Sequence, residues 1–149
     1  MARFSTTIVT PWHPQDAFEY LADVRNFARW DPGVRMVQAR DDQAPGVGAT
    51  YGVVVKSGPG SMMLRYEVIE FVAPTRIVLR AETRTLCSLD EIRVEPYDDG
   101  AQVTYDAELT LRRGGRVAEP LLAVAFRRIG GRAAAGLARA LAATVNSSV

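Results

Sequence analysis

The sequence predicts an α+β fold in which a curved antiparallel sheet is wrapped around one long C-terminal helix. Between residues 34 and 111, apolar and polar side chains alternate with a period of two, which indicates strands with one buried face. Between residues 116 and 144, apolar side chains recur at steps of three or four, which indicates an amphipathic helix. Short turns separate the strands and favour antiparallel neighbours, because parallel strands need longer crossovers.

Length, charge and cysteine content narrow the classes of protein to which the chain can belong. A length of 149 residues fits one domain, so we expect a single domain over residues 1–149. The net charge of +1 gives no bulk electrostatic reason to bind nucleic acid or an anionic membrane. No run approaches 18 apolar residues, which predicts no membrane span, and the N-terminus lacks the apolar segment of a secretory signal. The single cysteine, Cys87, fits a reducing compartment, and we expect a cytoplasmic protein.

The N-terminal part of the chain predicts one strand and two short helices. Residues 3–10 are rich in β-branched and aromatic side chains and end at Pro11, as a strand would. Pro14 suits the first turn of a helix that carries a short apolar stripe up to residue 22. A second brief helix or turn covers residues 24–30 and ends at Asp31-Pro32-Gly33.

Six further strands follow from the alternation of side chains. They cover residues 34–40, 50–56, 62–68, 76–81, 84–95 and 102–111. Connections that contain proline or glycine separate most of these strands, and Asp98-Asp99-Gly100 is a hairpin signal. The last strand has the clearest pattern, with Val103, Tyr105 and Ala107 on the inward face.

The C-terminal helix has an unusual apolar face. Leu122 and Phe126 are bulky, and Ile129 follows them on the same face, but the small residues Gly130 and Gly136 lie beside them. A helix face of small residues either packs very close to the sheet or leaves space beneath it. The Gly130-Gly131 pair costs about 1 kcal/mol per residue relative to alanine, so we expect a kink or a break there.

The ordered motifs of this chain resemble those of the SRPBCC superfamily, which includes START domains, polyketide cyclase/dehydrases and birch-pollen-allergen-like proteins. Residues 18–32 are similar to the opening helices of the superfamily, and residues 47–51 to its glycine-led third strand. Residues 66–76 and 94–105 are similar to two later segments, although Ala101 replaces the usual threonine. The resemblance implies a helix-grip fold, in which a seven-stranded antiparallel sheet curls around the C-terminal helix and leaves a cavity between them.

The resemblance also gives the inward strand faces and the small helix residues a role, since they would surround a bound molecule. The implied ligand is an apolar or amphipathic small molecule, lipid- or polyketide-like, because the lining is mostly apolar with a few polar groups. The predicted ligand-binding residues are Trp30, Tyr51, Val53, Met62, Leu64, Tyr66, Ser88, Asp90, Tyr105, Leu122, Phe126 and Ile129. The alternative interpretation is that these side chains form an ordinary packed core.

Asp90 is the most informative single residue, because the alternation places it on the inward face. A buried carboxylate needs a partner or takes up a proton, so Asp90 is a candidate general acid or base beside Ser88. Tyr66 and Tyr105 are further candidates, as hydrogen-bond donors to a carbonyl or an enolate. The alternatives are that Asp90 lies at the cavity mouth, that a β-bulge turns it outward, and that the tyrosines only pack.

No pattern in the chain predicts a metal or a cofactor. His13, the only histidine, lies in a proline-flanked turn and leaves no partner for a zinc site. The glycine pairs at residues 46–48 and 58–60 lack the contexts of a dinucleotide-binding motif and of a P-loop. Cys87 falls on the face opposite to Ser88, and nothing pairs it with His13.

Three hypotheses about function remain open, because the fold hosts many chemistries. The first is a binding or carrier protein for an apolar or amphipathic small molecule. The second is a polyketide cyclase, aromatase or dehydratase that uses Asp90 and the inward tyrosines. The third is a partner-binding domain whose cavity is filled. A homodimer is compatible with all three.

Overall fold

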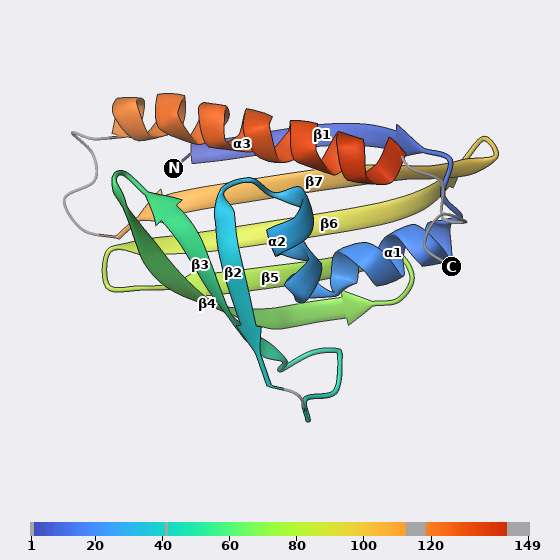
Figure 1. Cartoon of the computed structure of the whole chain (residues 1–149), viewed down its shortest axis with the longest axis horizontal. Coiled ribbons are helices and arrows are strands. Elements are labelled where there is room, and N and C mark those ends of the chain that lie inside the picture. Colours follow the sequence, from blue (N-terminus) through green and yellow to red (C-terminus); the bar gives the residue numbers. More distant parts are fainter. Residues whose placement is uncertain (1, 41, 113–118, 143–149) are drawn as a thin grey trace.

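Seven strands form one antiparallel sheet in the order β1-β7-β6-β5-β4-β3-β2, and a long helix lies against it (Figure 1). The computed structural model describes residues 2–40, 42–112 and 119–142, and for residues 119–125 the backbone alone. The elements in chain order are β1 (Ala2–Thr10), α1 (Pro14–Ala22), a 3₁₀ turn (Val24–Asn26), α2 (Phe27–Trp30), β2 (Val34–Ala39), β3 (Thr50–Ser57), β4 (Gly60–Val72), β5 (Arg76–Glu82), β6 (Leu86–Tyr97), β7 (Gly100–Leu111) and α3 (Glu119–Ala142). The predicted helix-grip architecture is confirmed, including the two short helices after the first strand.

The centre of the sheet is its most regular part. Strands β6 and β7 pair without a register shift from Leu86↔Leu111 to Tyr97↔Gly100. Asp98 closes their hairpin with a φ of +52°, a conformation that aspartate tolerates in turns. The hairpin predicted at this position is therefore confirmed, and strand β1 completes the sheet by pairing with the other side of β7.

Two β-bulges bend the sheet and reverse the alternation of side chains. The register shifts between Val34 and Met36 in β2, and between Val68 and Glu70 in β4. A bulge adds one residue to one strand and increases the local bend. Before its bulge, β4 buries Leu64, Tyr66 and Val68, but after the bulge the odd-numbered Phe71 turns inward.

Of the kink or break predicted at Gly130-Gly131, the break is wrong, because helix α3 is continuous through the glycine pair, whereas the kink stays a prediction. Gly130 lies on the buried side against the ring of Phe4, whereas Gly131 faces open space. The absence of a side chain at Gly130 lets the helix approach Phe4 of β1 closely. None of the described helices has both the length and the hydrophobicity needed to cross a membrane.

Ile129 is the residue of α3 that the sequence placed wrongly, since its side chain is 51% exposed. At 100° per residue, Ile129 shares one flank of the helix with Gly136 and Ala140. Gly136 is buried, and the backbone of Trp30 at the end of α2 lies against it. Residues on the same flank of α3 therefore differ in exposure, with Ile129 in solvent and Gly136 covered.

A buried hydrogen bond fixes the last turn of α3 to the end of β1. The Thr10 hydroxyl donates to the carbonyl oxygen of Leu141 over 2.6 Å, and both residues are fully buried. The Trp12 amide in turn donates to the Thr10 hydroxyl over 3.2 Å. Because helix ends leave carbonyl groups unpaired, this bond satisfies one of them inside the protein.

Candidate functional site

The small residues of α3 serve close packing at the two positions where the structure tests them. A Cβ atom at position 136 would overlap the Trp30 carbonyl oxygen and lie 3.1 Å from its carbonyl carbon. A Cβ atom at position 130 would overlap the ring of Phe4. The expectation that the small residues leave room for a ligand is therefore wrong at Gly130 and Gly136, because neighbouring groups already occupy that space.

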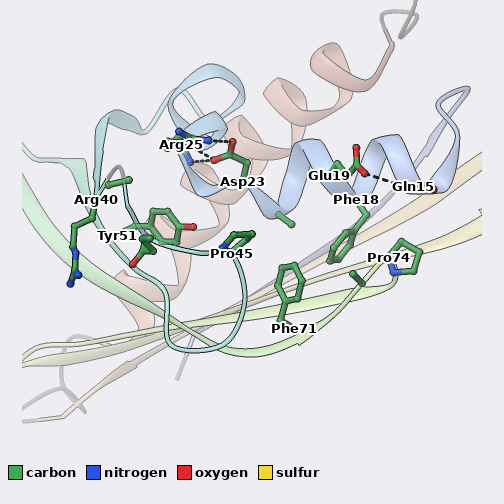
Figure 2. Close-up of a pocket in the computed structure, with 14 residues that line it drawn as sticks. Gln15, Phe18, Glu19, Asp23, Arg25, Arg40, Pro45, Tyr51, Phe71 and Pro74 are labelled. Carbon is green, nitrogen blue, oxygen red and sulfur yellow. Dashed lines mark hydrogen bonds and ion pairs between the residues drawn. The ribbon is translucent and has the colours of Figure 1, made fainter.

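A pocket of about 620 Å³ lies instead between α1, the connection from β2 to β3, and the turn that follows β4 (Figure 2). Its lining residues are Gln15, Phe18, Glu19, Ala22, Asp23, Arg25, Ala39, Arg40, Gln43, Pro45, Tyr51, Phe71, Ala73 and Pro74. Tyr51 is the only one of them that belongs to the ligand-binding set predicted from the sequence. We refer to this cavity as the α1 pocket.

The walls of the α1 pocket are apolar and come from three parts of the chain. Phe18 of α1 meets Phe71 of β4 edge to face, with ring centroids 5.6 Å apart. Pro45 and Pro74 lie across the pocket from α1 (Figure 2). Simple alternation along β4 points Phe71 outward, and only the bulge at residues 68–70 brings it in. Sequence reasoning missed this wall because a bulge leaves no clear signal in the alternation.

The connection between β2 and β3 is held over the pocket by the side chain of Gln43. This amide donates to the Thr50 carbonyl over 3.0 Å and accepts from the Thr50 N–H over 2.7 Å. Gly46 and Gly48 have φ values of +123° and +94°, which glycine adopts without strain. These features give residues 42–49 a defined path, so that Pro45 lines the cavity.

The rim of the α1 pocket is charged. Arg25 donates two hydrogen bonds to the Asp23 carboxylate, of 2.9 and 2.8 Å, and these bonds lower the pKa of Asp23. Glu19 accepts a hydrogen bond of 3.2 Å from Gln15, and Arg40 forms a loose, exposed pair with Asp42. Apolar walls with a charged rim are suited to a molecule that has an apolar body and a polar end.

A second group of polar side chains lies inside the protein, on the inward face of β4, β6 and β7. Tyr66 and Ser88 share a hydrogen bond of 2.9 Å, and the Tyr105 hydroxyl donates to Asp90 over 3.2 Å. Tyr66 and Ser88 stand on strands that are not neighbours, and both pair with Ala81 of the strand between them. The small side chain of Ala81 lets the tyrosine reach across. We call Tyr66, Ser88, Asp90 and Tyr105 the interior cluster.

Burial dominates the electrostatics of the interior cluster. The Asp90 side chain is 6% exposed, and burial raises its pKa to about 7, against the effect of the Tyr105 hydrogen bond. The charge of Asp31 raises the pKa of Asp90 further, whereas the nearby Ser88 hydroxyl lowers it. Burial and the charge of Asp90 raise the pKa values of Tyr66 and Tyr105. At neutral pH the carboxyl group is therefore poised between its two protonation states, whereas the tyrosines stay protonated.

Trp30 lies beside the interior cluster, and its indole N–H is a hydrogen-bond donor without a partner among the described residues. Its ring meets Tyr105 edge to face at 5.8 Å between centroids, and it packs against Phe27 at 5.0 Å. The side chain is 2% exposed, and its indole N–H has no hydrogen-bond partner among the described residues. A buried donor without a partner is rare and costs about 1–3 kcal/mol.

The structure places most of the predicted ligand-binding residues in the interior. Trp30, Tyr51, Val53, Leu64, Tyr66, Ser88, Asp90 and Tyr105 are buried, and Met62 and Phe126 are half-buried. Ile129 is exposed, and the side chain of Leu122 lies outside the described residues. The regular register at Asp90↔Ala107 excludes the alternative that a bulge turns Asp90 outward. Contact of these residues with a ligand stays a prediction.

A seven-stranded sheet curled against a C-terminal helix, with two short helices after its first strand, defines a helix-grip protein of the SRPBCC superfamily. Residues 1–144 match the family described as polyketide cyclase / dehydrase and lipid transport, and the chain belongs to that family. A comparison with curated protein sequences finds no match.

Solved structures with low sequence identity share the fold. The di-domain ARO/CYC StfQ from the steffimycin biosynthetic pathway is 16% identical, with a TM-score of 0.72. The match covers 95% of this chain and 50% of StfQ, so the chain spans about half the length of that protein. The Zhui aromatase/cyclase from Streptomyces sp. R1128 is 16% identical over 93% of this chain and 90% of its own, with a TM-score of 0.71. A START superfamily protein from Mycobacterium smegmatis is 11% identical, with a TM-score of 0.71. The match covers 95% of this chain and 97% of that protein's chain.

Proposed function

We propose that this protein binds an apolar or amphipathic small molecule, lipid- or polyketide-like, and acts as a carrier or binding protein. The observation that supports this proposal is the α1 pocket of about 620 Å³, with its apolar walls and charged rim. This volume lies within the range of about 300–1,000 Å³ that small-molecule sites occupy. The family description, which includes lipid transport, supports the same class of ligand.

Tyr51 links the α1 pocket to the interior residues predicted to contact the ligand. It lines the pocket, and its direct partner across the β3–β4 ladder is Tyr66 of the interior cluster. Side chains directly opposite each other in an antiparallel pair are in contact distance. In our proposal the apolar body of the ligand lies in the α1 pocket, and its inner end passes Tyr51 toward the interior cluster.

The second candidate function is that of a cyclase, aromatase or dehydratase. Asp90 favours it, because a buried carboxyl group with a pKa of about 7 can donate and accept a proton at neutral pH. StfQ and Zhui, which share the fold, are described as ARO/CYC and aromatase/cyclase. We favour the carrier because Asp90 does not line the α1 pocket, which holds the apolar body of the ligand in our proposal, and would meet only the inner end of the ligand. The carboxylate that does line it beside Arg25, Asp23, has a lowered pKa and is a poor proton donor.

The first test is binding of 1-anilinonaphthalene-8-sulfonate, a dye with an apolar ring system and one anionic group. We expect saturable fluorescence with the native protein. Ala22→Trp should abolish this signal because the indole fills the α1 pocket, which Ala22 lines. Ala138→Trp, the same exchange at an exposed position of α3, should leave the signal unchanged. Equal loss or equal retention in both variants would contradict binding in the α1 pocket.

Native mass spectrometry before and after organic extraction complements the dye experiment. A co-purified adduct of lipid or polyketide size, lost on extraction, would support a carrier and give the ligand class. The absence of dye binding together with a clean apo mass would favour the third hypothesis, a partner-binding domain. The cytoplasmic location and the homodimer stay predictions, and light scattering of the purified protein tests the latter.

A further inference from the structure

The interior cluster and Trp30 together have an incomplete set of hydrogen bonds. The Asp90 carboxylate accepts a hydrogen bond from Tyr105 over 3.2 Å. A carboxylate has about four acceptor sites, so Asp90 keeps capacity for a further donor. The indole N–H of Trp30, against Tyr105, has no acceptor among the described residues. One donor and one acceptor therefore stay unused on two residues that both contact Tyr105.

We infer that the interior cluster binds a hydroxyl group of the ligand, which donates to Asp90 and accepts from the indole N–H of Trp30. A ketone or an ether can only accept, and an ammonium group can only donate. A hydroxyl group can donate and accept, so it can form hydrogen bonds with Asp90 and Trp30 at the same time. The inference rests on the proposed function and narrows the ligand class to hydroxylated apolar molecules, such as phenols and long-chain alcohols.

The neighbours of Asp90 across its two ladders differ in size. Ala107 pairs with Asp90 on the β7 side, and Leu79 pairs with it on the β5 side. In our proposal the hydroxyl group therefore binds on the β7 side of the carboxylate, beside Ala107 and Tyr105. Tyr66, at the other end of the cluster, stands directly opposite Tyr51 at the wall of the α1 pocket. The cluster therefore lies at the inner end of the path proposed for the ligand.

A pair of probes that differ at one group tests the inference. 2-Naphthol and 2-methoxynaphthalene share an apolar ring system, but only the naphthol can donate a hydrogen bond. At about pH 8, where Asp90 is mostly charged, we expect 2-naphthol to bind about tenfold tighter or more, as a hydrogen bond to a charged group would give. The indole N–H resonance of Trp30, assigned with a Trp30→Phe variant, should shift with 2-naphthol and stay in place with the ether.

Two variants remove one half of the site each. Trp30→Phe keeps an aromatic ring but removes the unpaired donor together with part of the buried indole, and Asp90→Asn removes the charged acceptor. Each should lower the preference for 2-naphthol several-fold, whereas Asp99→Asn, the same exchange in an exposed turn, should leave it unchanged. Because the indole N–H that Trp30→Phe removes has no partner among the residues the structure describes, this variant still tests the site where Asp90→Asn fails to fold.

The outcomes separate this inference from the proposed function. If both probes bind with equal affinity and the Trp30 resonance does not move, the interior holds only water and the inference is wrong, although the carrier proposal stands. If the preference for 2-naphthol persists in both variants, the hydroxyl group binds elsewhere and the inference is again wrong. If neither probe binds at all, the proposed function itself fails.

Discussion

Replacing Gly136 by alanine tests how closely α3 packs on the end of α2. The added methyl group would overlap the carbonyl oxygen of Trp30 and lie 3.2 Å from Pro32 Cδ. The carbonyl belongs to the backbone and cannot rotate away as the tip of a side chain can. The same exchange at Gly131, in the same helix, meets nothing within 4 Å. The two variants therefore share a gain in helix propensity and differ only in packing.

The expected effects have opposite signs. Gly131→Ala should stabilise the protein by about 1 kcal/mol, the difference in helix propensity between the two residues. Gly136→Ala gains the same amount but overpacks the contact with Trp30, which costs about 3 kcal/mol at the upper end of measured values. The net loss is about 2 kcal/mol, and the two variants should differ by about 3 kcal/mol, or about 6–12 °C in Tm for a chain of this size.

Urea unfolding followed by circular dichroism gives both free energies of unfolding, and thermal melts give the Tm values. The midpoint should move down for Gly136→Ala and up for Gly131→Ala, with the slope unchanged. Stabilisation of similar size in both variants would refute the close contact between α3 and Trp30. It would also reopen the interpretation that the small residues of α3 leave free space.

Three further predictions concern buried polar groups. Thr10→Val removes the hydroxyl that donates to the Leu141 carbonyl, so we expect a loss of about 1–2 kcal/mol in urea unfolding; a loss near zero would mean that water replaces the bond. Tyr66→Phe and Ser88→Ala should each cost about 1 kcal/mol, and the double variant less than their sum, because both remove one bond; strict additivity would show that the bond is not formed. Burial raises the pKa of Asp90 from 3.8 to about 7, so the folded state binds this proton more tightly than the unfolded chain does. Its stabilising contribution is therefore complete below about pH 4 and is lost as the pH rises to about 7, by up to about 4 kcal/mol. Asp90→Asn should remove this dependence of stability on pH, and an identical pH profile in the variant would show that Asp90 is solvated.

The alternation of side chains predicted the inward face of the sheet wherever the strands pair regularly. Asp90 and Tyr105 lie on β6 and β7, which pair without a register shift, so the alternation correctly predicted that both face inward. Phe71 lies beyond a bulge, where the same count gives the wrong face. The aromatic wall of the α1 pocket depends on that bulge, and one extra residue in a ladder has no distinct composition.

The C-terminal helix shows a second limit of sequence reasoning. Periodicity predicted the element, but it could not decide between two adjacent flanks. Ile129 and Gly136 share a flank, and only the contact with Trp30, distant in the sequence, buries one and not the other. The same long-range contact decides whether small residues mean close packing or free space. Residue spacing within a helix carries no information about where another element will cross it.

The reach of Tyr66 over Ala81 to Ser88 has a consequence for how this protein can evolve. The hydrogen bond crosses three strands because β5 offers only a methyl group between them. A valine or leucine at position 81 would occupy that space, separate the two hydroxyl groups and leave the backbone as it is. One nucleotide change, from an alanine to a valine codon, could thus break this hydrogen bond and leave two buried hydroxyl groups in need of new partners. Within a lineage that keeps this fold, the chemistry of the ligand could change abruptly, without the gradual remodelling of loops that usually accompanies a new specificity.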